Sequence, residues 1–133
     1  MRLFDTHCHI ADPRFDSDRD DVIQRMRDAG VARALVVADP REEICDGPED
    51  EGGRQIAVGN EGKVFSIVEA HDFLYGAVGV HPHNASGWDA DAEATVRRWL
   101  EHPKCRLLGE IGLDMGICRM VMTPGCGLAQ ERS

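Results

Sequence analysis

The feature that most constrains this fold is a regular alternation between short apolar runs and segments in which apolar residues recur at helical spacing. Four runs have the length and composition of strands, and they lie at residues 2–6, 31–38, 73–80 and 105–113. Three segments have the helical pattern, and they lie at residues 16–30, 62–72 and 89–102. Because parallel strands need a long crossover connection, usually a helix, this order predicts an α/β fold with about four parallel strands.

Two further stretches lack any periodicity. Residues 39–54 hold seven acidic and two basic side chains together with Gly and Pro, so we expect mostly loop there, with room for a short helical turn. Residues 115–133 form an irregular tail, and only its last letters, LAQERS, are typical of a helix start. We therefore predict one domain over residues 1–114, followed by a tail that leads into a truncated helix.

Length and charge limit the classes of function. The 133 residues suffice for one ordinary domain, and 15 basic against 24 acidic side chains give a formal net charge of −9. This acidity argues against a high-affinity DNA-binding module, but it leaves open an enzyme that meets phosphate through bound cations. No apolar run approaches the ~18 residues that span a membrane, and no secretory signal is evident, so we expect a cytoplasmic protein without membrane contact.

Polar side chains with metal-binding chemistry fall where the predicted strands end. His7 and His9 follow the first strand, His81 and His83 follow the third, and Glu110 lies near the end of the fourth. Parallel sheets place their functional groups at the carboxyl ends of the strands. We therefore expect these residues to meet at one edge of the sheet.

The pair His7 and His9 is the first candidate metal site. Residues i and i+2 of a strand point to the same face, which puts the two side chains ~6.6 Å apart along the strand and within reach of one cation. Neutral imidazole suits zinc and other first-row divalent metals. The alternative is two unrelated polar residues at a strand end. Cys8 would point to the opposite face, where packing is its simplest role.

Glu110 is the second candidate. It lies in an apolar strand, where an unpaired carboxylate is costly to bury, and a bound cation would remove that cost. The alternatives are a salt-bridged core residue or a side chain that reaches solvent at an edge. Two histidines and one glutamate also form a known catalytic zinc set with an open position for water.

The other histidines point less clearly to function. For His81, which precedes a proline, a role in a site and a role in the loop are equally supported, and His83 is expected to be structural or exposed. His71 and His102 lie near helix ends, where capping is the simplest role. Asp114 follows the fourth strand and would serve either beside the site or as a turn residue.

Three motifs together resemble the TatD family of metal-dependent deoxyribonucleases. They are FDTHCHI at residues 4–10, GVHPH at residues 79–83 and LLGEIGLD at residues 107–114. The resemblance covers residues 1 to about 114. It implies a TIM-type (β/α)₈ barrel with one or two divalent metals, Mg, Mn or Zn, at its carboxyl face, and hydrolysis of phosphodiester bonds, usually in DNA.

The resemblance also implies a role for each matching residue. His7 and His9 would bind one metal, Glu110 would bridge two metals, and His81 would line the site beside the substrate phosphate. Glu110 and His81 are therefore the predicted catalytic residues. The family places two further metal-binding histidines and an essential aspartate in the second half of the barrel, and this sequence has no counterpart of them.

A barrel of this type typically needs ~250 residues, so the sequence resembles the N-terminal half of one, as a truncated gene, a fragment or one half of an assembly. We expect impaired activity and weakly held DNA. We also expect self-association, because a half barrel leaves its first and fourth strands with open edges.

Two alternatives remain open at this point. An amidohydrolase-type metal hydrolase, which acts on C–N bonds, also begins with His-x-His, although GVHPH and GEIGLD favour the nuclease. The other alternative is an inactive remnant or a binding fragment, which the missing ligands favour.

Overall fold

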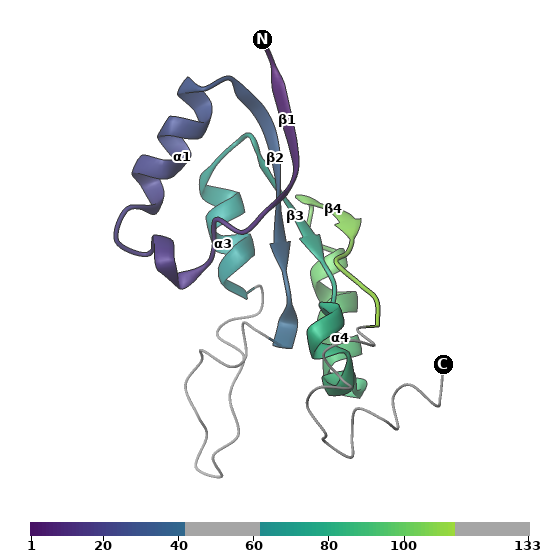
Figure 1. Ribbon diagram of the computed structural model, residues 1–133. Helices are drawn as coiled ribbons and strands as arrows, with labels where there is room; N and C mark the ends of the chain where they lie inside the picture. The colour runs from purple at the N-terminus through teal and green to yellow at the C-terminus, as the bar shows by residue number, and fades with distance from the viewer. Residues whose placement is uncertain (42–61, 114–133) are drawn as a thin grey trace.

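The computed structural model describes residues 1–41 and 62–113, and four parallel strands form one sheet in these residues (Figure 1). The strands lie side by side in chain order, which confirms the predicted α/β class and the partial barrel. Their bounds are Leu3–Cys8 for β1, Val31–Ala38 for β2, Leu74–Val78 for β3 and Cys105–Leu108 for β4. The tail after residue 114 and most of the acidic stretch lie outside the described residues.

Each connection between consecutive strands contains one of three described α-helices. Helix α1 spans Arg19–Asp28, α3 spans Gly62–Ala70 and α4 spans Ala90–Leu100. Helix α1 packs on β2, α3 on β2 and β3, and α4 on β3 and β4 (Figure 1). Two short 3₁₀ helices, η1 at Pro13–Phe15 and η2 at Pro82–Gly87, lie in the loops after β1 and β3. Neither these helices nor the others described are long and apolar enough to cross a membrane.

Local sequence explains where two of the helices begin and end. Asp20 and Asp21 lie in the first turn of α1, where the helix dipole favours negative charge. Gly30 follows the helix with φ +93°, a backbone conformation that favours glycine, and this ends α1 where the sequence predicts. The side chain of Asp89 caps α4 by accepting a hydrogen bond from the backbone N–H of Ala92 at 2.8 Å.

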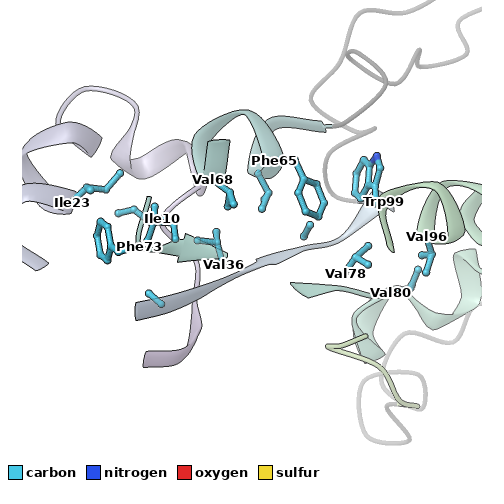
Figure 2. Close-up of a cluster of buried hydrophobic side chains, with 14 of the residues drawn as sticks. Ile10, Ile23, Val36, Phe65, Val68, Phe73, Val78, Val80, Val96 and Trp99 are labelled. Carbon is cyan, nitrogen blue, oxygen red and sulfur yellow. The ribbon is translucent and has the colours of Figure 1, made fainter. Parts of the chain in front are cut away.

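The hydrophobic core lies between the sheet and the helices (Figure 2). Phe65 of α3 is fully buried and meets Trp99 of α4 edge to face, with 5.9 Å between ring centroids. Gly76 of β3 makes room for the Phe65 ring, because a Cβ there would overlap it. The core therefore joins both helices to the middle of the sheet, and it fixes the strand ends that carry the polar residues.

The outer strands differ from the inner ones in exposure. Strand β2, with a neighbour on each side, is largely buried. In contrast, Phe4 of β1 is 60% exposed and Leu108 of β4 is 50% exposed, and Ile111 beyond β4 is 61% exposed. Within the described residues β1 and β4 each have one neighbouring strand, so the sheet has two open edges lined with apolar side chains.

The fourth strand is shorter than the sequence predicts. We expect residues 105–113 to form it, but β4 ends at Leu108. The last backbone bond to β3 runs from Gly109 N–H to the carbonyl of Val78 at 2.8 Å. With no second strand beside it among the described residues, the chain leaves the sheet there, and Glu110 lies beyond the strand rather than inside it.

Candidate metal centre

The carboxyl ends of β1, β3 and β4 bring four of the predicted residues together, His7, His9, His81 and Glu110. His7 is the penultimate residue of β1 and His9 follows the strand. Their rings converge so that the two Nε2 atoms lie 3.0 Å apart. The backbone N–H of His7 donates to Oδ1 of Asp5 at 3.0 Å, which holds the strand end in place. The two imidazoles therefore present nitrogen atoms to one point in space, as the His-x-His spacing predicts.

Glu110 completes this cluster. Its Oε2 atom lies 3.3 Å from Nε2 of His7, and its Oε1 atom lies 3.4 Å from Nε2 of His81. The side chain of Glu110 is 32% exposed, so the prediction of a carboxylate buried within a strand is wrong. The carboxylate instead reaches solvent at the strand end, where the two histidines lie beside it.

His7, His9 and Glu110 each offer one ligand atom, and these atoms all lie within 4.8 Å of one another. In a tetrahedral zinc site with bonds of 2.0–2.1 Å, neighbouring ligand atoms are about 3.3–3.4 Å apart. The distances of 3.0 Å between the two Nε2 atoms and 3.3 Å between Nε2 of His7 and Oε2 of Glu110 differ from this by a few tenths of an ångström. Two of the three distances are therefore close to those of a tetrahedral site, and with the third within 4.8 Å the donor set can close on one divalent cation.

Gly79 determines how closely Glu110 approaches the end of β3. A Cβ atom on Gly79 would lie 2.5 Å from the carbonyl oxygen of Glu110 and 2.9 Å from the carbonyl carbon of Gly109. Real Cβ atoms essentially never come closer than 3.0 Å to such atoms. Only glycine at this position lets the backbone after β4 approach the end of β3 so closely, and this approach places Glu110 beside the histidines.

His81 joins the cluster through the loop after β3. Its Nδ1 atom accepts a hydrogen bond from the backbone N–H of His83 at 3.0 Å, which makes His81 the cap of η2. Its Nε2 atom faces Glu110. One ring nitrogen of His81 therefore supports the loop and the other faces Glu110, and a role of His81 in the site stays a prediction.

Asp39 is a residue of this region that our sequence reasoning missed. It is 5% exposed, and it accepts hydrogen bonds from the backbone N–H groups of Arg41 and His81 and from the side-chain amide of Asn84. The sequence predicts it to lie in the acidic loop of residues 39–54. The available signal was its position, because it is the first residue after the buried strand β2.

The other candidate residues that the structure describes do not belong to this cluster of possible metal ligands. Cys8 packs against the core, and burial raises the pKa of its thiol to about 11, so it is neutral at ordinary pH. Nε2 of His71 lies 3.8 Å from Oδ1 of Asp20 at the start of α1. His102 is buried, with Nε2 3.0 Å from Oε1 of Glu69 and Nδ1 accepting from the backbone N–H of residue 104. Asp114 lies outside the described residues.

The sequence is similar to those of known proteins. A family model described as TatD related DNase matches residues 4–123. The chain is 33% identical over 113 residues to a protein of Erwinia tasmaniensis named 3′-5′ ssDNA/RNA exonuclease TatD, and 30% identical over 112 residues to the uncharacterized metal-dependent hydrolase YabD of Bacillus subtilis. Each match covers 84% of this chain and 37% of the relative.

A solved structure confirms the predicted fold. The crystal structure of YJJV, a TatD homologue from Escherichia coli K12, superimposes with a TM-score of 0.67 at 26% identity. The superposition covers 98% of this chain and 42% of the E. coli protein. The chain therefore spans about two fifths of the length of the relatives that it matches.

Proposed function

Since the chain belongs to the family of TatD-related DNases, we propose that it carries a divalent-metal centre for the hydrolysis of phosphodiester bonds in nucleic acid. The observation that carries the proposal is the convergence of His7, His9 and Glu110 at the carboxyl edge of the sheet. Parallel α/β sheets present their chemistry at this edge. Residues 1–114 would form the functional part of the chain, with residues 115–133 as a tail.

Three side chains of the centre would bind the cation, and a fourth would face the substrate. His7 and His9 would hold the ion through Nε2, and Glu110 would add a negatively charged oxygen. A divalent cation bound there supplies positive charge to a phosphoryl oxygen and lowers the pKa of a water molecule. Nε2 of His81 lies 3.4 Å from Oε1 of Glu110, so His81 would line the site beside the substrate phosphate. Glu110 and His81 are thus the proposed catalytic residues.

The expected substrate is single-stranded nucleic acid, DNA before RNA. Relatives of the chain are named as ssDNA/RNA exonucleases. A chain with net charge −9 repels a polyanion, so binding would depend on the cation and would be weak. We also expect slow turnover, because three ligands in a partly exposed site hold a cation less firmly than a complete set.

The test is cleavage of end-labelled single-stranded DNA by the purified chain with Mg²⁺, Mn²⁺ or Zn²⁺. The proposal predicts slow cleavage that a chelator abolishes and that His9→Ala lowers at least ~100-fold. His71→Ala serves as the matched control, because His71 lies beside Asp20 of α1 and outside the ligand set. Cleavage that survives both the chelator and His9→Ala would contradict the proposal.

We further propose that the chain self-associates through its open sheet edges. Exposed Phe4 on β1 and exposed Leu107 and Leu108 on β4 lie on strands whose outer backbone groups have no neighbouring strand among the described residues. Such edges favour pairing with another copy. Light scattering tests this, and Leu108→Asp should shift the population toward monomer. A monodisperse monomer of the unaltered chain at micromolar concentration would contradict it.

A further inference from the structure

The carboxylate of Asp39 connects the end of β2 to the loop that carries His81. Its Oδ2 atom accepts from the backbone N–H of His81 at 2.8 Å and from Nδ2 of Asn84 at 2.9 Å, and its Oδ1 atom accepts from the backbone N–H of Arg41 at 2.7 Å. The residue is 5% exposed. A buried carboxylate is costly unless hydrogen-bond donors satisfy it. Three donors do so here, and together they fix the position of the Asp39 side chain.

The loop that Asp39 holds determines which nitrogen of His81 carries a proton. The backbone N–H of His83 donates to Nδ1 of His81 at 3.0 Å, and a nitrogen that accepts a hydrogen bond must be unprotonated. In a neutral imidazole the proton then lies on Nε2. That nitrogen is 3.4 Å from Oε1 of Glu110, about 0.2 Å beyond the usual length of an N–H···O bond, so a small rotation closes the bond.

We propose that Asp39 is a positioning residue of the metal centre, which holds His81 as an Nε2–H donor to Glu110. With its Oε1 atom engaged by His81, Glu110 keeps its Oε2 atom beside His7, 3.3 Å from Nε2. A carboxylate ligand whose second oxygen is fixed by a hydrogen bond is oriented before a cation arrives. This inference rests on the proposed function of the metal centre. It makes His81 a hydrogen-bond donor to Glu110 rather than a metal ligand.

The first measurement is the tautomer of the His81 ring in the metal-free chain, by long-range ¹H–¹⁵N correlation at pH 8. The expected pattern is a protonated Nε2 and a bare Nδ1. A protonated Nδ1 would overturn the proposal without any variant. This readout does not depend on activity, so it remains decisive even if the chain cleaves no nucleic acid.

Variants of Asp39 then test the connection to the metal. Asp39→Asn keeps an oxygen for the N–H of His81, whereas Asp39→Leu keeps the approximate volume and accepts no hydrogen bond. We expect Asp39→Leu to mix the two tautomers of His81 and to weaken Mn²⁺ binding about 10- to 100-fold. Asp39→Asn should retain the tautomer and stay within about threefold of the original affinity. Asn84→Ala is the control, since it removes a different donor from the same oxygen.

A folded Asp39→Leu variant with an unchanged tautomer and unchanged Mn²⁺ affinity would refute the role of Asp39. If Asp39→Leu does not fold, Asp39→Ala, which also accepts no hydrogen bond from His81, takes its place, and an unchanged tautomer with unchanged Mn²⁺ affinity in that variant would refute the proposal. If the unaltered chain binds no Mn²⁺, the proposed function fails, and the tautomer pattern still shows whether Asp39 and the loop set the state of His81.

Discussion

The substitution Gly79→Ala should break the metal centre by displacing Glu110, although Gly79 contributes no ligand. The new Cβ would lie 2.5 Å from the carbonyl oxygen of Glu110, and real Cβ atoms keep at least 3.0 Å, so the backbone must retreat by at least 3.0 − 2.5 = 0.5 Å. Ligand positions tolerate errors of about 0.5 Å. We therefore expect divalent-metal affinity to fall about 10- to 100-fold. Overpacking should also lower the free energy of unfolding by about 1–3 kcal/mol.

Gly76→Ala provides the matched control, because the same substitution in β3 forces a Cβ into the ring of Phe65, away from the metal ligands. Both variants should unfold at lower denaturant concentration, but only Gly79→Ala should weaken binding. Isothermal titration with Mn²⁺, with denaturant unfolding in parallel, separates the two effects. The reasoning is refuted if Gly79→Ala binds Mn²⁺ like the unaltered chain, or if Gly76→Ala loses affinity equally.

Three further predictions follow from the ligand set, the α4 cap and the core. A divalent cation at 100 times its Kd should raise the free energy of unfolding by about 2.7 kcal/mol, and a chelator should reverse the shift in Tm. The N–H of Ala92 holds the pKa of Asp89 below its ordinary value, so this cap stabilises the chain above about pH 4 and is lost as the pH falls through the lowered pKa. The difference in Tm between the unaltered chain and Asp89→Ala should then be constant at pH 5–8 and shrink at lower pH; a difference that grows on acidification would contradict this. Phe65→Ala should cost about 3–5 kcal/mol in denaturant unfolding, whereas Trp88→Ala, at a half-exposed position, should cost far less, and equal losses would contradict the described core.

The strand and helix order could be predicted because short apolar runs alternate with segments of helical spacing, and burial of the inner strands β2 and β3 and of one face of α4 agrees with that pattern. The pair His7 and His9 was also predictable, since two residues apart on a strand share a face. The structure differs in how they meet, because His9 lies beyond the strand and the rings turn toward each other. The register between β1 and β2 is also irregular between Asp5 and Cys8, the stretch that holds His7, and the sequence pattern does not encode this.

Two features of the site lay beyond the sequence. The surroundings of Glu110 depend on the residue at which β4 ends. That end is determined by the strands beside β4 rather than by the apolar residues of β4 itself. The role of Asp39 depends on donors 42 and 45 positions away in the chain, His81 and Asn84. In the sequence, Asp39 is one of seven acids in an aperiodic stretch, and only the folded loop shows why it is buried.

The central claim is that His7, His9 and Glu110 form one divalent-metal site, and a titration of the purified chain with Mn²⁺ tests it most directly. We expect one ion per chain, with affinity lost in both His7→Ala and Glu110→Gln and retained in the control His71→Ala, which changes a histidine beside α1. Binding that is absent from the unaltered chain, or equal in all four proteins, would contradict it.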